Sequence, residues 1–587
     1  MTLTRHLNAL ESCGLLRLAQ TLPELEYLFR HALTQDAAYN TLVKADRVQL
    51  HRAVGETLER LHAGRRDEFA PLLARHFAEA GDDRRALEYF TLAGDVAARA
   101  YANTEAAEHY AQAIAIARRI SAEGQFKRLY LKRGRALQSS ARYPEAWANY
   151  VEMESVARER GDRTLELVSL IEQATLRSVY SPIIDPDLAR TLLDRALALA
   201  GELDDHGAEA RILWTLMRIT VFSGEDPGLA ITYGERSLAL AREYGMHGQL
   251  AYTLNDIQYA YRSAGQVDRA LAALDEARDL WRAQGNLHML ADNLTQAASI
   301  YGLSGRLTQA LALTDEAYQI SVPSNNVTQQ VLSQVVAGQV YMYLGQPDRA
   351  LGNLERAHSL GSPFGTGQID SVLALLYGSY GAIERALASA RQSYAVTQST
   401  PLFRVYGVYI VGMLGWLHAL NGELTEAERL LAEAHRLAYG TGVALWLGGA
   451  QLLLAEGELA LARRDYPRVV ESMQRTTATL RAQSVRVDVP EALYLAARAL
   501  LALDRLQEAH AMLCEARAEA EGMGVRRILW RILLTFSQAE ERRGNPAEAE
   551  SLRRQAREII GDIADHCPPD LRASFLDLPD VKEAFPA

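Results

Sequence analysis

The chain has 587 residues, and its 62 Lys and Arg residues are outnumbered by 73 Asp and Glu residues, which gives a formal net charge of −11. A general nucleic-acid-binding protein needs a basic surface that displaces counterions from phosphates, so this charge balance excludes that class. Apolar residues make up 49% of the sequence, enough to fill large buried cores. At this length we expect either several globular domains or one repeat array.

Cysteine usage and hydropathy indicate a cytoplasmic protein. Cys13, Cys514 and Cys567 are few, odd in number and far apart, with no spacing typical of a disulfide framework or a zinc site. The first residues lack the apolar core of a signal peptide. The most apolar run, residues 405–417, is too short to span a bilayer, so we interpret it as a buried helix and expect no membrane partner.

The first 64 residues do not follow the pattern of the rest of the chain. Residues 27–54 read YLFRHALTQDAAYNTLVKADRVQLHRAV and are dense in the residue types of active sites. His31 and Asp36 are five residues apart on an expected helix, roughly 140° around it, so they do not share a face. His51 and His76 fall on separate predicted helices, without Cys or carboxylate neighbours at metal-binding spacing. We therefore expect a structural role for this stretch.

One frame then recurs about every 40 residues. Residues 261–277, 301–317 and 341–357 each carry Tyr, Gly four residues later, Ala five residues after the Gly, and a second Ala seven residues further on. Apolar residues at three- and four-residue spacing on both sides predict two helices, and the Gly supplies the left-handed backbone that ends the first. We count about thirteen such hairpins. Upstream, their turns are expected at Gly81, near Ala102, at Ala141, near residues 182–186 and at Gly224.

The turn Gly and the two Ala positions resemble the tetratricopeptide repeat, over roughly residues 65 to 560. The resemblance implies an all-α fold, a right-handed superhelical solenoid of stacked tetratricopeptide-like hairpins with a concave and a convex face. The period of about 40 exceeds the 34 residues of that family, so the helices are expected to be longer. The Pro that often closes a tetratricopeptide unit is absent from most copies.

Both ends of the chain resemble a more specific family. Residues 3–20 (LTRHLNALESCGLLRLAQ), 27–42 (YLFRHALTQDAAYNTL) and 567–585 (CPPDLRASFLDLPDVKEAF) are similar to segments of bacterial signal-transduction ATPases with numerous domains, of the maltose-regulator-like or cyclase-fused type. In those proteins a nucleotide-binding domain precedes a winged helix, a linker and tetratricopeptide-like repeats.

This second resemblance implies three parts for the chain. Residues 1–64 would be a remnant of the winged helix plus linker helices, residues 65–560 the repeat solenoid, and residues 561–587 a C-terminal capping tail. Met1 would then lie inside the winged helix, and the chain would be the sensor half of such a protein or its free-standing descendant.

No catalytic centre is predicted. The sequence has no G-x-x-x-x-G-K-[ST] motif, so it offers neither the Lys nor the backbone cradle that nucleotide hydrolysis needs. We also find no metal-ligand spacing and no nucleophile arrangement, and therefore expect a protein that is not an enzyme and uses no cofactor.

Candidate ligand-binding residues follow from the tetratricopeptide resemblance. That family usually binds peptides or protein segments on the concave face, through positions 2, 5, 9 and 12 of each first helix. Transferring these positions to the frames of this sequence gives fourteen residues: Arg128, Arg135, Arg211, Trp214, Arg218, Tyr252, Asn255, Tyr259, Arg262, Gln339, Met342, Tyr343, Tyr409 and Trp416. The Arg residues suit carboxylates or phosphates, and the aromatic and Asn residues suit an aliphatic or extended peptide. The alternative is that the Arg side chains are solvated or pair with neighbouring Glu, and that the aromatic rings pack between repeats.

The sequence thus predicts a non-catalytic scaffold that binds a protein or peptide, as the sensor array of a signalling ATPase-like protein. An N-terminal effector or ATPase domain is a further candidate partner. Two alternatives stay open: a free-standing peptide receptor of the quorum-sensing kind, and a fragment of a transcriptional regulator. Residues 3–16 contain one Arg and one His, too few for a helix that contacts phosphates, so no nucleic-acid partner is expected.

Overall fold

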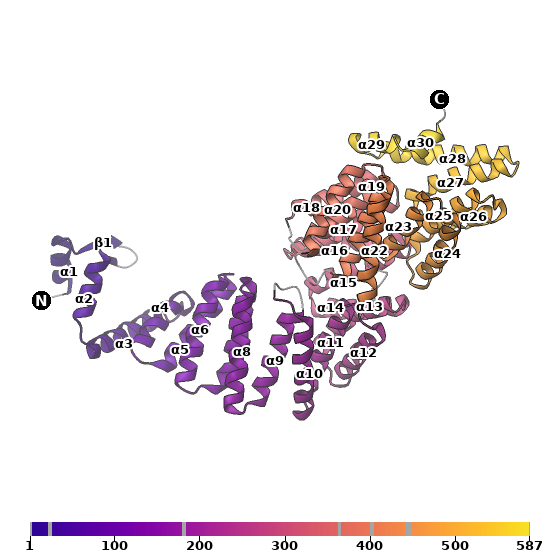
Figure 1. Ribbon diagram of the computed structural model, residues 1–587. Coiled ribbons are helices and arrows are strands. Elements are labelled where there is room, and N and C mark those ends of the chain that lie inside the picture. Colours follow the sequence, from indigo (N-terminus) through magenta and orange to yellow (C-terminus); the bar gives the residue numbers. More distant parts are fainter. Residues whose placement is uncertain are drawn as a thin grey trace. The chain divides into compact units, whose positions relative to one another are not determined.

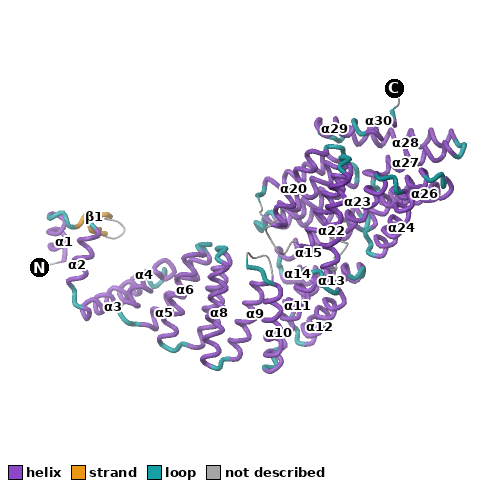
Figure 2. Tube along the Cα trace, viewed as in Figure 1, coloured by secondary structure: helices purple, strands orange, loops and turns teal. Residues whose placement is uncertain are grey.

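The computed structural model describes residues 3–20, 26–178, 183–361, 366–398, 404–441 and 449–585 (Figure 1). In these residues the chain is an all-α solenoid: the helices α1 to α30 are accompanied by one two-stranded antiparallel sheet (Figure 2). The predicted fold class is therefore confirmed. The chain divides into two compact units, unit 1 (Met1–Leu176) and unit 2 (Arg177–Ala587).

Unit 1 begins with a short helix and a β-hairpin. Its first elements are α1 (Leu3–Ser12), β1 (Leu16–Gln20), β2 (Glu26–Phe29), α2 (Ala32–Thr41) and α3 (Lys44–Leu61). The strands pair antiparallel, with Leu16 opposite Phe29. Sequence reasoning expected a winged-helix remnant followed by linker helices here and did not locate the strands, because five- and four-residue runs give too little alternation to be recognised.

The helical hairpins start at α4. Unit 1 continues with α4 (Arg66–Glu79), α5 (Asp83–Arg99), α6 (Asn103–Arg119), α7 (Phe126–Ser139), α8 (Tyr143–Arg160) and α9 (Arg163–Ser178), whose last residues belong to unit 2. From α4 to α28 the described residues form twenty-five helices; within the two units they make eleven hairpins, and α6 is an additional helix that follows the hairpin α4–α5. The turn predicted near Ala102 joins α5 to this additional helix. The turn predicted near residues 182–186 lies partly outside the described residues.

Unit 2 contains the regular part of the array. Its helices are α10 (Pro186–Glu202), α11 (His206–Phe222), α12 (Pro227–Glu243), α13 (His247–Ser263), α14 (Val267–Gln284), α15 (Leu287–Leu303), α16 (Leu307–Ser321), α17 (Val327–Tyr343), α18 (Pro347–Ser359), α19 (Thr366–Ser379), α20 (Ile383–Gln398), α21 (Arg404–Leu420), α22 (Leu424–Thr441), α23 (Gly449–Ala462), α24 (Tyr466–Ala482), α25 (Val489–Ala502), α26 (Leu506–Met523), α27 (Arg526–Arg542), α28 (Pro546–Asp565), α29 (Pro569–Leu576) and α30 (Pro579–Ala584). A short 3-10 helix, η4 (Arg486–Asp488), precedes α25.

The turns adopt the backbone conformation that the sequence frame predicts. Gly265 and Gly345 have φ values of 72° and 73°, in the left-handed region that ends an α-helix. Where the frame lacks Gly, the conformation is kept: Arg464 and Asp504 both have φ of 60°. The hairpin geometry of the repeat therefore overrides the preference of these two side chains for negative φ.

Small residues let the two helices of a hairpin approach closely. A Cβ placed on Gly415 of α21 would lie 2.7 Å from Leu431 of α22. On α18, Ala350 is fully buried, and its carbonyl oxygen would lie 3.3 Å from a Cβ placed on Gly338 of α17. In these two hairpins a small residue on one helix therefore lets the backbone of the other approach.

Within unit 2, the turns of early hairpins pack against helices far along the chain. A Cβ placed on the turn glycine Gly265 would lie 3.0 Å from the carbonyl oxygen of Ala482. A Cβ placed on Gly345 would lie 3.1 Å from the Cβ of Arg526. The sequence did not predict these contacts. They bring α24 against the turn of α13–α14, and α27 and α28 against the turn of α17–α18. The connection between α24 and α25 lines one side of the cavity described below.

The C-terminal helices cover the end of this core. Phe575 of α29 is fully buried, and its ring lies 5.5 Å from that of Tyr380 and 5.8 Å from that of Trp530. The helix α28 ends at Asp565, a few residues beyond the predicted start of the tail.

In the described part of the chain no helix is long and apolar enough to cross a bilayer. The apolar run 405–417 lies in α21, with Val411 and Leu417 fully buried.

Candidate functional site

Unit 2 contains a cavity of about 520 Å³, within the size range of ligand pockets. Its walls come mainly from the first helices of successive hairpins, α11, α13, α15, α17 and α19. Further residues come from α20, α21, α23 and the connection between α24 and α25. The cavity is therefore lined by the side of the hairpins on which the sequence placed its candidate residues.

Each wall helix contributes one face. On α15 the lining residues include Asp292, Gln296, Ser299 and Leu303, which are three or four residues apart. This spacing places side chains above one another on a helix. The neighbouring first helices α13 and α17 repeat the arrangement, because the whole hairpin repeats every 40 residues.

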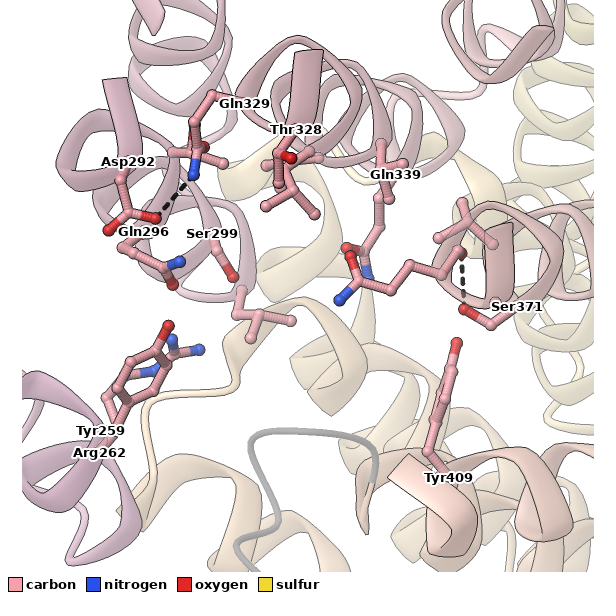
Figure 3. A pocket seen from close by; sticks show the side chains of 18 of the residues that line it. Tyr259, Arg262, Asp292, Gln296, Ser299, Thr328, Gln329, Gln339, Ser371 and Tyr409 are labelled. Carbon is pink, nitrogen blue, oxygen red and sulfur yellow. Dashed lines mark hydrogen bonds between the residues drawn. The ribbon is translucent and has the colours of Figure 1, made fainter. Parts of the chain in front are cut away.

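Eight of the fourteen predicted residues line the cavity. They come from α11, α13, α17 and α21, and are Trp214, Arg218, Tyr252, Tyr259, Arg262, Gln339, Tyr343 and Tyr409. Figure 3 shows Tyr259 and Arg262 projecting from α13 on one side of the opening and Tyr409 projecting on the other. Whether they bind a ligand stays a prediction.

Three predicted residues are buried behind the wall. Met342 is fully buried in the apolar core, because it lies about 100° around α17 from Tyr343, which faces the cavity. Trp416 is 4% exposed, and its ring atom Cζ3 would lie 2.7 Å from a Cβ placed on Gly378. Asn255 is 1% exposed and supports the cavity residues through hydrogen bonds. For Asn255 and Met342 the neighbouring residues Asp256 and Tyr343 line the cavity, so a shift of one residue turns a side chain from the cavity into the core.

The remaining three predicted residues lie elsewhere. Arg211 is partly buried on α11 and is not among the residues that line the cavity. Arg128 and Arg135 are exposed on α7, in unit 1. The predicted row of Arg residues is therefore divided between the two units.

At the centre of the polar wall, two carboxylates accept hydrogen bonds from the same side-chain amide. The Nδ2 of Asn255 lies 2.9 Å from Oδ2 of Asp292 and 3.3 Å from Oδ1 of Asp256, so one amide donates to both. The Nδ2 of Asn293, which is also fully buried, donates to Oδ1 of Asn255 over 3.1 Å. The same Nδ2 of Asn293 also donates to the backbone carbonyl oxygen of Leu274 over 3.0 Å. The two carboxylates are thus held in place from behind.

The partners of the two carboxylates differ. Asp256 accepts from Nε1 of Trp214 over 3.0 Å and lies 3.5 Å from Nε of Arg218, whose guanidinium stands 5.0 Å from the Trp214 ring centre. Asp292 accepts from Nε2 of Gln329 over 2.8 Å, the contact dashed in Figure 3. Asp256 therefore has a charged partner, whereas the hydrogen bonds of Asp292 come from amides.

Burial raises the pKa of the Asp292 carboxyl above its ordinary value of 3.8. The amide of Asn255 opposes this shift because it donates to the charged form, and the negative charge of Asp256 adds to it.

Aromatic rings surround this end of the cavity. The ring centres of Trp214 and Tyr252 are 6.1 Å apart, and Tyr252 makes an edge contact of 4.9 Å with the buried Trp281. Phe222 and Tyr259 form a further pair at 5.3 Å. Contacts of this kind hold the rings rigidly, so little side-chain freedom is lost when a ligand packs on them.

The rest of the wall is rich in neutral hydrogen-bonding groups. They come from α15, α17, α19, α20 and α23, and are Gln296, Ser299, Thr328, Gln329, Gln339, Gln368, Ser371, Ser393 and Gln451. At the far side Asp488 of η4 also lines the cavity, and burial raises its pKa to about 7. Arg527, which lies 3.9 Å from Asp488, opposes that shift.

Sequence reasoning missed Asp292, Gln296 and Ser299, although the signal was present. These residues lie 40 positions after Tyr252, Asp256 and Tyr259 and therefore occupy the same places in the next repeat. The frame was transferred to the hairpins on either side but not to the one whose turn is Gly305. Asp256 was missed because it lies next to the chosen Asn255.

The described residues offer no metal centre, since no group of three or more His, Cys, Asp or Glu side chains among them is arranged to hold an ion. In unit 1 the Nδ1 atoms of His51 and His76 lie 2.9 Å apart, and Nε2 of His51 lies 3.0 Å from the Tyr39 hydroxyl. These histidines, which the sequence placed on separate helices, thus pack α2, α3 and α4 together.

No protein-family model matches the chain, and no similar sequence is found among curated proteins. A solved structure that does match is described as "Crystal Structure of Rap Protein Complexed with Competence and Sporulation Factor"; it is 12% identical, with a TM-score of 0.44 over 62% of this chain and 99% of that one. Similarity at this level does not transfer the ligand of that protein to this chain.

Proposed function

We propose that this chain is a non-catalytic scaffold that binds a peptide or an extended protein segment in the cavity of unit 2. The observation that carries the proposal is the repetition of one helix face along α13, α15 and α17, each presenting hydrogen-bonding side chains to the same cavity. A row of equivalent faces suits a ligand that is itself a repeating chain.

The chemistry of the wall fits a polypeptide backbone. Side-chain amides such as those of Gln296, Gln339 and Gln368 both donate and accept hydrogen bonds, and a peptide bond offers one donor and one acceptor. Packed helices lie about 8–10 Å apart, which corresponds to roughly three residues of extended chain per hairpin. The aromatic residues Tyr252 and Tyr259 would then hold ligand side chains.

The ligand would act on the packing of unit 2. Val485 and Asp488, from the connection between α24 and α25, line the same cavity as residues of α11 to α19. A ligand that contacts both sets stabilises the arrangement in which they are close, and so biases the array toward one state. This is the behaviour expected of a sensor array in a signalling ATPase-like protein, which the resemblance at both ends of the sequence supports.

The two alternatives make different predictions. A free-standing receptor of the quorum-sensing kind would use the same cavity for short peptides. A fragment of a transcriptional regulator is favoured by the order α1, β1, β2, which is that of a recognition helix followed by a wing. Against it, α1 carries only Arg5 and His6 as basic residues, too few for the phosphate contacts of such a helix.

A peptide-release experiment tests the proposal. Protein purified from its native host is treated with mild acid, and the released peptides and retained proteins are identified by mass spectrometry. We expect wild-type protein and Tyr244→Ala to carry the same ligands, because Tyr244 is an exposed aromatic residue that does not line the cavity.

Tyr252→Ala, which removes an exposed ring from the cavity, should lose these ligands. Short peptides would favour the free-standing receptor, and protein segments would favour the sensor array. Equal ligand sets in all three proteins would exclude the cavity as the binding site.

A further inference from the structure

Asp292 is a cavity-lining carboxylate whose charge is not balanced by a cation. Among the described residues no Arg, Lys or His lies within ion-pair distance of it, while its oxygens accept from the neutral amides of Asn255 and Gln329 and the amide of Gln296 also stabilises its charged form. A carboxylate has about four acceptor positions, so three neutral amides leave part of its capacity unused and its charge without a cation. A partly buried charge of this kind is costly unless a partner arrives.

Gln329 provides a second, independent sign of a missing partner. Its side chain is only 6% exposed and lines the cavity, and its Nε2 is committed to Asp292. Its Oε1 has no hydrogen-bond partner. Buried polar atoms in folded proteins are nearly always paired, so this oxygen is an acceptor awaiting a donor. Exchanging Oε1 and Nε2 of Gln329 by rotating its amide would not satisfy the oxygen, because Oε1 would then face the carboxylate of Asp292.

Several charged groups line the same cavity, and none occupies this position. Arg218 is held by Asp256 and stands over Trp214. Arg262 and His288 line the cavity from α13 and α15, but neither is within ion-pair distance of Asp292. The aromatic rings of Trp214 and Tyr252 lie on the same wall, and their faces attract cations. Hydrogen-bond acceptors and ring faces thus surround Asp292, and among the described residues no cationic side chain is paired with it.

We infer that Asp292, together with Oε1 of Gln329 and the nearby Asp256, forms a subsite for a cationic group of the ligand. The inference rests on the proposed function, since it names a chemical feature of the peptide or protein segment in the same cavity. The group carries several N–H donors, as do the guanidinium of arginine, the ammonium of lysine and a free N-terminal ammonium. An anionic side chain at this position would be repelled by both carboxylates.

The test uses small probes and the full chain. Saturation-transfer NMR titrations measure the binding of Nα-acetyl-arginine amide, Nα-acetyl-lysine amide and alanine amide, which present a guanidinium, a side-chain ammonium and an α-ammonium in turn. Nα-acetyl-citrulline amide has nearly the shape of the arginine probe without its charge. The variants are Asp292→Asn and, as a control, Asp275→Asn, which neutralises an outward-facing carboxylate paired with Arg278. Circular dichroism confirms that each variant folds.

We expect at least one cationic probe to bind the wild type and Asp275→Asn at least about tenfold more tightly than the citrulline probe, and to lose that advantage in Asp292→Asn. The cationic probe that binds most tightly shows whether the subsite prefers a guanidinium, a side-chain ammonium or an α-ammonium. The subsite would be overturned if no cationic probe bound, if none of them bound more tightly than the citrulline probe, or if both variants bound the cationic probes equally. Should Asp292→Asn unfold, the comparison of the charged and uncharged probes on the wild type decides.

A random hexapeptide library separates this inference from the proposed function. Binding of library peptides without enrichment of basic residues would remove the subsite and keep the peptide-binding function. Binding of a cationic probe without any bound hexapeptide would keep the subsite and argue against a peptide ligand.

Discussion

A Cβ placed on Gly381 would lie 2.9 Å from the carbonyl oxygen of Ser574. Gly381 forms the turn between α19 and α20, whereas Ser574 belongs to α29 near the end of the chain. Real Cβ atoms essentially never approach a backbone oxygen this closely, so only glycine allows α29 to dock here. The turn glycines of the repeat therefore have two roles: they end helices, and some of them admit a distant helix.

Because only some turn glycines admit a distant helix, the same Gly→Ala substitution should reduce stability by different amounts in neighbouring repeats. Gly381 and Gly422 have φ values of 78° and 79°, but nothing lies near a Cβ on Gly422. Both Gly→Ala variants should lose on the order of 1 kcal/mol of free energy of unfolding, because Ala disfavours the left-handed backbone. Gly381→Ala should lose about 1–3 kcal/mol more through overpacking. Urea unfolding measures both, and equal losses would mean that α29 is not docked on this turn.

The hairpin crossings predict an effect that depends on position along one helix. Ala350→Leu places a large side chain at the fully buried crossing of α17 and α18, and should cost about 1–3 kcal/mol. Gly352→Leu introduces the same side chain two residues later, at an exposed position with nothing near its Cβ. It should be neutral or slightly stabilising, because Leu favours a helix more than Gly does. If both variants melt like the wild type, Ala350 is not at the crossing.

Asp370 predicts a pH dependence of stability. This α19 residue is 4% exposed, its Oδ2 has no hydrogen-bond partner, and burial raises its pKa from 3.8 to about 6, against a smaller opposing effect of His358. Between about pH 4 and 6 the folded chain keeps a proton that the unfolded chain releases. The contribution of Asp370 to the free energy of unfolding should therefore fall as pH rises through this window, by an amount on the order of 1–3 kcal/mol.

The Asp370→Asn variant isolates this contribution. It should unfold at the same or a lower denaturant concentration than the wild type at pH 4, and at a higher one at pH 7.5. The difference between the two proteins should stay constant above about pH 7, where Asp370 is deprotonated in both the folded and the unfolded chain. A difference independent of pH from 4 to 7.5 would show that Asp370 titrates normally.

The buried ion pair of α25 and α27 predicts a large penalty for removing one partner. Arg527 and Glu491 are 7% and 8% exposed, with 2.5 Å between Nη2 and Oε2. Glu491→Gln leaves a buried guanidinium with weakened partners and should cost about 3 kcal/mol or more. The exposed pair of Arg242 and Glu276, at 2.7 Å, is the matched control. Glu276→Gln should cost less than about 1 kcal/mol, and similar losses in the two variants would contradict the burial of the first pair.

Local features of the fold could be predicted because they are set by short stretches of sequence. Turn glycines, the small residues at crossings and the inward face of each first helix all recur with the 40-residue period. That period placed Tyr252 and Tyr259 on the cavity wall, and it also contained Asp292 and Ser299, one repeat further on. The sequence pattern thus indicated the parts of the wall on α11, α13, α17 and α21, but the residues of α15 were not chosen.

The features that could not be predicted depend on long-range geometry. Nothing near Gly381 in the sequence indicates that its turn meets Ser574, because this depends on how far each hairpin rotates relative to the last. The small error at Met342 has a related cause, since the exact face of a helix depends on packing that a pattern of apolar residues defines only to within about one residue. Arg527 and Asp488 face each other for the same long-range reason.

The contrast between Gln339 and Met342 on α17 predicts opposite outcomes for two alanine variants. Gln339 lines the cavity and is partly exposed, whereas Met342 is fully buried in the core. Gln339→Ala should weaken the binding of a peptide selected from the hexapeptide library on wild-type protein by about tenfold, with little change in melting temperature. Met342→Ala removes a packed side chain and should cost about 2–5 kcal/mol of stability. Below its melting temperature it should still bind the peptide, because its side chain does not reach the cavity. Isothermal titration and thermal unfolding measure the two quantities, and a loss of binding in folded Met342→Ala with none in Gln339→Ala would place the ligand on another face of α17.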